Sequence, residues 1–182
     1  MKLYLHENKK LIRIAITGPE STGKSDLAKN LAEHYRTVWV PEYAREYLDK
    51  LNREYNYEDI LLIAKGQVKA ETGMLEKANR FLFADTEMIV LKIWCEVKYG
   101  KCHPWILNQL AKQNYDLYLL TDIDLPWQPD PLREHPDKRR ELFNLYLDEM
   151  KKRNLPFEIV SGFGDQRLAN AIEIIEKRFK TG

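Results

Sequence analysis

The chain has 182 residues, of which 44% are hydrophobic and 31% are charged, a composition typical of a folded domain and not of a disordered chain. Its 29 basic and 28 acidic residues give a formal net charge of +1, so no basic excess favours a nucleic-acid partner. The segment Met1–Glu7 lacks the apolar run of a secretion signal, and no stretch reaches the length of a membrane span. We therefore expect one cytoplasmic domain over residues 1–182, with no membrane partner.

Short apolar segments alternate with longer helical patterns along the chain. Strands are predicted over residues 11–17, 37–41, 80–85, 115–121 and 157–161. Helices are predicted over residues 24–35, 43–51, 58–78, 86–99, 136–153 and about 164–179. Near-continuous apolar strands that alternate with helices indicate βαβ units. The predicted fold class is therefore α/β, with a parallel sheet covered on both faces.

The turn after the first strand carries the clearest chemical signal. It reads Gly18-Pro19-Glu20-Ser21-Thr22-Gly23-Lys24-Ser25 and matches G-x-x-x-x-G-K-[ST] at every position, between an apolar strand and an amphipathic helix. Its glycines let backbone N–H groups point at a phosphate, and the helix adds the positive end of its dipole. Lys24 should reach the β- and γ-phosphates of ATP, and the Ser25 hydroxyl should bind Mg²⁺. All eight residues are therefore predicted to bind ATP.

Polar groups follow the other strands, and in an open parallel sheet these strand ends share one crevice. They are Glu42 with Arg45, Asp85, Asp122 with Asp124, and Ser161 with Gly162. Asp85 ends an apolar strand, where a Mg²⁺ ligand or a catalytic base is expected, although it could instead cap the next helix beside Thr86. Glu42 and Arg45 could equally form an ion pair within one helix.

One helix and one loop hold further candidates. Gln67 lies in the apolar stripe of helix 58–78, so it is either a core amide bonded to backbone or a ligand contact. Four prolines between residues 126 and 136 require a loop, which Pro136 should end by starting the next helix. The loop contains Trp127 and Arg133, and Arg139 follows it. Such a loop is usually functional, although a solvated charge run is the alternative.

Several of these segments occur in the order of a known family. They are the phosphate loop, Pro41 to Tyr47, Phe83-Ala84-Asp85-Thr86, Pro126-Trp127 through Leu132-Arg133, and Arg139/Arg140 before Phe143. Over nearly the whole chain, from about Leu11 to Phe179, they resemble the ribosylnicotinamide kinase domain of the NadR-like family. The resemblance implies a nucleoside-kinase-like P-loop fold of three αβα layers, with strand order 2-3-1-4-5. It also implies Mg-ATP as donor and nicotinamide riboside as acceptor, in NAD biosynthesis.

The resemblance also implies roles for particular residues. Residues 125–140 become a lid whose arginines, Arg133 and Arg139, close over the phosphates. Lys24, Asp85 and Arg133 become the catalytic candidates, with Asp85 either the base or a metal ligand. Glu42, Tyr43, Arg45 and Trp127 become acceptor-site candidates. Because the acceptor ring is cationic, Asp122 or Asp124 could supply a charge and Gln67 could bond its carboxamide; Gly162 is expected on the ATP side.

Two departures from the family stand out. The bifunctional relative carries an adenylyltransferase domain and a DNA-binding helix-turn-helix before the kinase, and we expect neither function here. Its lid usually reads Asp-Gly-Leu-Arg, whereas this chain has Pro131 at the glycine position, which stiffens the loop. A kinase for another nucleoside or a vitamin alcohol and a regulatory P-loop ATPase stay open as alternatives, as does a homo-oligomer.

Overall fold

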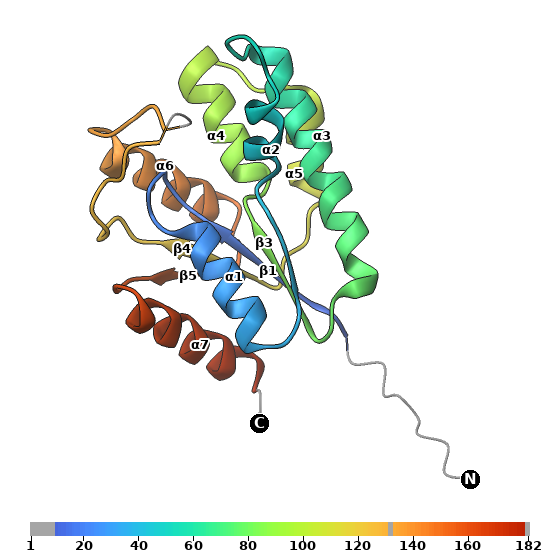
Figure 1. Cartoon of the computed structure of the whole chain (residues 1–182), viewed down its shortest axis with the longest axis vertical. Helices are drawn as coiled ribbons and strands as arrows, with labels where there is room; N and C mark the ends of the chain where they lie inside the picture. Colours follow the sequence, from blue (N-terminus) through green and yellow to red (C-terminus); the bar gives the residue numbers. More distant parts are fainter. Residues whose placement is uncertain (1–9, 131–132, 181–182) are drawn as a thin grey trace.

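Five parallel strands form the sheet at the centre of the fold (Figure 1). They are β1 (Ile12–Thr17), β2 (Val38–Val40), β3 (Phe81–Asp85), β4 (Leu117–Thr121) and β5 (Phe157–Val160). Their order is β2-β3-β1-β4-β5, and every neighbouring pair is parallel. The predicted parallel sheet and its strand order are therefore confirmed.

This computed structural model describes residues 10–130 and 133–180. Met1–Glu7 and Pro131, for which the sequence raised expectations, lie outside the described residues. None of the helices in the described ranges is long and apolar enough to cross a membrane.

Seven α-helices connect and flank the strands within the described ranges. They are α1 (Lys24–His34), α2 (Tyr43–Asp49), α3 (Tyr57–Met74), α4 (Met88–Tyr99), α5 (Pro104–Lys112), α6 (Arg139–Lys152) and α7 (Asp165–Phe179), with a short 3₁₀ turn, η1 (Leu75–Lys77), after α3. Helix α5 was not predicted, although Pro104 stands at its first turn and Ile106 and Leu110 bury one face four residues apart.

Helix α6 begins at Arg139, so the expectation that Pro136 starts it is wrong. The backbone N–H groups of Glu134 and His135 donate to a carboxylate oxygen of Glu20 in the phosphate loop, at 3.0 and 3.2 Å. These bonds hold the segment before Pro136 against the phosphate loop, and the helix starts only after it.

The alternation of side chains along each strand divides the core into two halves. Ile14, Phe83 and Leu119 face α1 and α7, whereas Ala15, Leu82 and Leu120 face α3 to α6. Side chains of successive strand residues point to opposite faces, so continuous apolar strands can be buried on both sides. The result is the expected three-layer arrangement, with α1 and α7 on one face of the sheet (Figure 1).

Candidate active site

The phosphate loop turns tightly between β1 and α1. Gly18 has φ of 135°, and a Cβ there would lie 2.6 Å from Thr121 Oγ1, so only glycine fits. Thr22 Oγ1 donates to the Pro19 carbonyl oxygen at 2.8 Å, and Lys24 Nζ donates to the same oxygen, also at 2.8 Å. Gly23 precedes the first turn of α1 and provides no side-chain cap for its N–H groups. These N–H groups lie at the positive end of the α1 dipole, and the binding of a phosphate by them and by Lys24 stays a prediction.

Asp85 and Ser25 form the pair that fits a metal ion. Ser25 Oγ donates to Asp85 Oδ2 at 2.5 Å, across the ends of β3 and α1. The other carboxylate oxygen, Oδ1, is buried and has no hydrogen-bond partner among residues 10–130 and 133–180. Burial and the neighbouring charge of Glu42 raise the pKa of Asp85 to about 7. A buried oxygen without a partner beside a hydroxyl is a site that a divalent cation would satisfy.

The residues that follow Asp85 exclude its alternative role as a helix cap. Helix α4 is capped instead by Glu87, whose carboxylate accepts from Ile89 N at 2.7 Å. Between them, Thr86 has φ of 78°, a left-handed conformation that a β-branched residue rarely adopts. Strain of this kind is common at functional sites.

A cavity of about 350 Å³ opens beside the phosphate loop. Glu42 and Arg45, at the end of β2 and in α2, form one wall, and they do not pair with each other: Arg45 Nη1 bonds Asp130 Oδ2 at 3.1 Å. The other walls are mostly apolar and aromatic. They comprise Ala44, Leu48, Tyr55, Val90, Ile93, Trp94, Val97, Leu142 and Tyr146. Asp85 itself does not line the cavity.

The loop between β4 and α6 covers this cavity with Arg133, Glu134 and His135. Arg133 Nη1 donates to Gln128 O at 2.5 Å and lies 3.5 Å from Ser21 Oγ, so it stands over the phosphate loop. The Glu134 carboxylate accepts from Tyr55 Oη at 2.8 Å and from Lys98 Nζ at 2.7 Å. These contacts hold residues 133–135 over the site, within the segment predicted to be a lid.

Arg139 has a different role from the predicted phosphate contact. Its guanidinium donates to the carbonyl oxygens of Ile123 and Leu125 at 2.6 to 2.8 Å and to Ser21 O at 3.3 Å. It does not line the cavity. Arg139 thus uses its donors to hold the base of the lid against the phosphate loop, and its contact with ATP stays a prediction.

Gln67 and Tyr43, both predicted to contact the acceptor, instead contact each other and the protein around the site. Gln67 is 2% exposed; its Oε1 accepts from Tyr43 N at 2.8 Å, and its Nε2 lies 3.3 Å from the carbonyl oxygens of Asp85 and Thr86. The amide is thus bonded to backbone, and its predicted contact with the acceptor is wrong. Tyr43 packs on Gly66 of α3, where an added Cβ would lie 2.0 Å from its ring, and it does not line the cavity.

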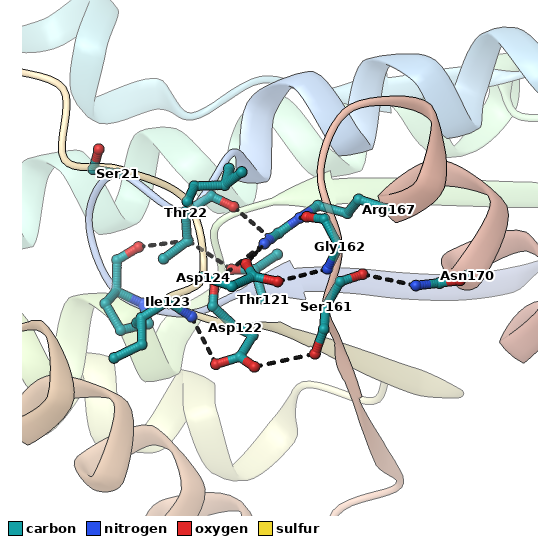
Figure 2. A network of polar contacts seen from close by, with 12 residues as sticks. Ser21, Thr22, Thr121, Asp122, Ile123, Asp124, Ser161, Gly162, Arg167 and Asn170 are labelled. Carbon is teal, nitrogen blue, oxygen red and sulfur yellow. Dashed lines mark hydrogen bonds and ion pairs between the residues drawn. The ribbon is translucent and has the colours of Figure 1, made fainter.

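Asp122, Asp124 and Trp127 likewise lie outside the cavity. Asp124 Oδ2 accepts from Gly162 N at 2.6 Å, and its other oxygen pairs with Arg167; Asp122 Oδ2 accepts from Ser161 Oγ at 3.1 Å (Figure 2). Both aspartates therefore join the ends of β4 and β5, on the side of the phosphate loop opposite Glu42. Contact of these residues or of Trp127 with the acceptor stays a prediction, and the lining of this cavity does not support it.

Sequence reasoning missed several residues of the site. Tyr55, Trp94 and Glu134 surround the cavity, and Trp94 Nε1 donates to Tyr55 Oη at 2.9 Å. Trp94 follows Val90 by four residues on one helix face, a spacing that could have been noticed but reads equally as core. Tyr55 and Glu134 lie in loops where no local pattern marks them.

A parallel sheet of this order, with a phosphate loop between β1 and α1, defines a P-loop nucleotide-binding protein. The chain belongs to the AAA domain family, whose model matches residues 13–167.

Within this family, the chain is similar to proteins named NadR. The chain is 28% identical over 173 residues to the trifunctional NAD biosynthesis/regulator protein NadR of Escherichia coli (strain K12), covering 90% of this chain and 42% of the relative. It thus spans less than half the length of that protein. A crystal structure of NadR protein in complex with NR is similar with a TM-score of 0.81 at 21% identity, over 94% of this chain and 52% of the other. A NadR structure in complex with NAD and AMP-PNP gives a TM-score of 0.78 at 22% identity, covering 94% and 50%.

Proposed function

We propose that the chain is an ATP-dependent kinase that phosphorylates a ribosyl hydroxyl of nicotinamide riboside and so forms nicotinamide mononucleotide in NAD biosynthesis. The observation that carries the proposal is that the phosphate loop, Glu42 and a set of aromatic side chains line one and the same cavity. A phosphoryl donor and a small acceptor would meet there. The similarity to NadR, one structure of which contains NR, supports the choice of acceptor.

The cavity has the chemistry that a cationic nucleoside requires. Its volume of about 350 Å³ lies in the range of small-molecule sites. Tyr55 and Trp94 offer aromatic surfaces, and a cation over such a ring gains roughly 0.5–2 kcal/mol. Glu42 and Glu134 add carboxylates to its lining. A pyridinium ring would be favoured here over a neutral base, because a neutral base gains from neither interaction.

The donor side requires ATP with Mg²⁺. Lys24 would bind the β- and γ-phosphate oxygens, and backbone N–H groups of the loop would bind the remainder. Ser25 and Asp85 would hold the metal, since Asp85 has a buried oxygen without a hydrogen-bond partner in the described chain. Magnesium, when bound, offsets the negative charge of the phosphates.

Glu42 is the better candidate to accept the proton of the acceptor hydroxyl. It lines the cavity, whereas Asp85 lies outside it and bonds Ser25. Arg133 and the lid would exclude water, so that the hydroxyl and not water receives the phosphoryl group. We therefore assign Asp85 to the metal and Glu42 to the proton.

The direct test measures phosphorylated product from a panel of nucleosides that includes nicotinamide riboside, uridine, cytidine and adenosine. Nicotinamide riboside should exceed each neutral nucleoside by at least about tenfold in kcat/KM, roughly 1.4 kcal/mol of transition-state binding. Trp94→Ala should reduce that preference, and Trp127→Ala, the matched control outside the cavity, should not. A neutral nucleoside that matches nicotinamide riboside would eliminate this acceptor and leave another nucleoside kinase in its place.

The AAA domain family match keeps a regulatory ATPase as the second candidate. That protein would hydrolyse ATP without any acceptor and would couple the nucleotide to binding of a partner. ATP turnover that no nucleoside or vitamin alcohol accelerates, and that yields no phosphorylated acceptor, would decide for this alternative.

A further inference from the structure

A buried arginine lies behind the phosphate loop. Arg167, in the first turn of α7, is 4% exposed. Its Nη1 donates to Thr22 O in the phosphate loop at 2.8 Å, and its Nε donates to Gly162 O at 2.8 Å (Figure 2). The remaining nitrogen, Nη2, donates to Asp122 O at 3.3 Å and pairs with Asp124. One side chain therefore joins the residues that follow β1, β4 and β5.

The segment after β5 is held from several sides. Besides Arg167, Asp124 accepts from Gly162 N at 2.6 Å, and Asn170 Nδ2 donates to Ser161 O at 2.9 Å. Gly162 has φ of 110°, and a Cβ there would lie 3.1 Å from Arg167 N, so the segment lies directly on the start of α7. Phe163, next in the chain, is 60% exposed.

The two sides of the phosphate loop have different roles. Glu42, Arg45 and the acceptor cavity lie on the β2–β3 side, and no residue that follows β5 lines that cavity. Since ligands of an open parallel sheet bind at the carboxyl ends of its strands, the β4–β5 side is left for the nucleoside part of ATP. The polar groups there are held by Arg167.

We infer that Arg167 is a positioning residue for ATP, which fixes the phosphate loop and the 161–164 segment at the separation that one ATP molecule spans. The inference rests on the proposed use of ATP. A guanidinium suits this role because its planar fork bonds several acceptors in fixed directions, whereas a lysine ammonium cannot reproduce that geometry. Each of its three side-chain nitrogens bonds a protein oxygen, so it acts on ATP through the residues that it holds.

The test compares Arg167→Lys with Arg13→Lys. Arg13 also uses a guanidinium fork, toward Glu71 and Asn114 O, but it lies near the amino end of β1, remote from the phosphate loop. Both variants keep the charge and lose the fork. Calorimetry would measure the Kd of ATP and of inorganic tripolyphosphate, both with Mg²⁺, and a thermal melt would compare stability.

For Arg167→Lys we expect the Kd of ATP to rise by about tenfold or more, since misplacement of a supporting group typically has this effect. The Kd of tripolyphosphate, which does not reach the 161–164 segment, should rise by less. Arg13→Lys should change neither Kd even where its melting temperature falls as far. If Arg167→Lys does not fold, Asp124→Asn, which keeps the arginine but removes its charged partner, should give the same ordering of effects.

Two results would overturn the inference alone. An unchanged Kd for both ligands would make Arg167 a structural residue, and an equal rise for both would restrict it to the phosphate loop. A wild-type chain that binds no ATP would refute the proposed function and this inference with it.

Discussion

The lid is held against the acceptor wall by one cluster of polar side chains, and this cluster leads to a prediction. The Glu134 carboxylate accepts from Tyr55 Oη at 2.8 Å and from Lys98 Nζ at 2.7 Å. The side chains of Lys98 and Glu134 are 32% and 33% exposed. Burial raises the pKa of Tyr55 to about 12, so its hydroxyl keeps the proton that it donates. Glu134→Gln removes the charge while it keeps the shape.

The size of the effect follows from these contacts. A hydrogen bond to a charged group contributes about 1.5–3 kcal/mol when it is buried, and an exposed ion pair about 0.2–1 kcal/mol. Groups that are one-third exposed fall between these ranges, so loss of the charge should destabilise the closed lid by about 1–2 kcal/mol. Because 1.4 kcal/mol is tenfold in an equilibrium, kcat/KM for the acceptor should fall about tenfold. Hydrolysis of ATP without acceptor should rise, as water enters.

Steady-state kinetics at saturating ATP, together with hydrolysis measured without acceptor, would test this prediction. Lys98→Met should reproduce the effect, and the double variant should be little worse than either single one, since both remove the same interaction. Lys101→Met is the matched control, because Lys101 lies over the Tyr57 ring and makes no contact with the described residues of the lid. Normal kinetics in folded Glu134→Gln would refute the lid contact as a determinant of closure.

Three further predictions concern the phosphate loop, the two carboxylates near it and the stability of the fold. Lys24→Ala should lower kcat by roughly 10²-fold with a near-normal melt, the scale of one lost electrostatic contact in the transition state; near-normal turnover would remove the loop from the mechanism. Asp85→Asn should raise the Mg²⁺ concentration needed for half-maximal activity by about tenfold or more, whereas Glu42→Gln should lower kcat without that change; the reverse pattern would exchange their roles. Hydrogen bonds from Arg53 hold the pKa of Asp59 below its ordinary value in the folded protein, although burial opposes this shift. The charged Asp59 therefore stabilises the folded state at pH values above its unfolded pKa of about 3.9, and this contribution is lost in more acidic solution. Asp59→Asn should therefore unfold more easily at neutral pH by about 2 kcal/mol, and urea titrations should show that gap closing below about pH 4; a constant gap would contradict the linkage.

The parts of the structure that local sequence determines could be predicted. The continuous apolar strands predicted a sheet covered on both faces. The phosphate-loop motif predicted that this loop connects a strand to a helix. The strand order could not be predicted in this way, because no local pattern determines it. It was predicted from the family resemblance, and the structure confirms it. Helix α5 escaped prediction because its apolar positions, Ile106 and Leu110, are few and its length is short.

The lining of the cavity proposed for the acceptor was predicted only in part, since it depends on where side chains point. Trp127 stands in the proline-rich loop and looked like the aromatic group of the site, but Trp94 on α4 lines the cavity. Apolar residues on one helix face line the core and the cavity alike, so spacing cannot separate the two. Arg167 occupies a helix with many charged residues, and only the packing of α7 against the sheet brings its guanidinium behind the phosphate loop.

Strand order also decides which carboxylate serves which purpose. β3, and not β2, is the neighbour of β1, and Asp85 pairs in register with Ile16, immediately before the turn that leads to the phosphate loop. The Asp85 carboxylate therefore accepts a hydrogen bond from Ser25, and Gln67 Nε2 donates to the Asp85 carbonyl oxygen. Glu42, one strand further out, is displaced toward the cavity. In an order with β2 beside β1, Glu42 would face Ser25 and Asp85 would face the acceptor. The same residues at the same sequence positions would then exchange the metal and the proton, so the assignment of roles rests on topology and not on the motifs alone.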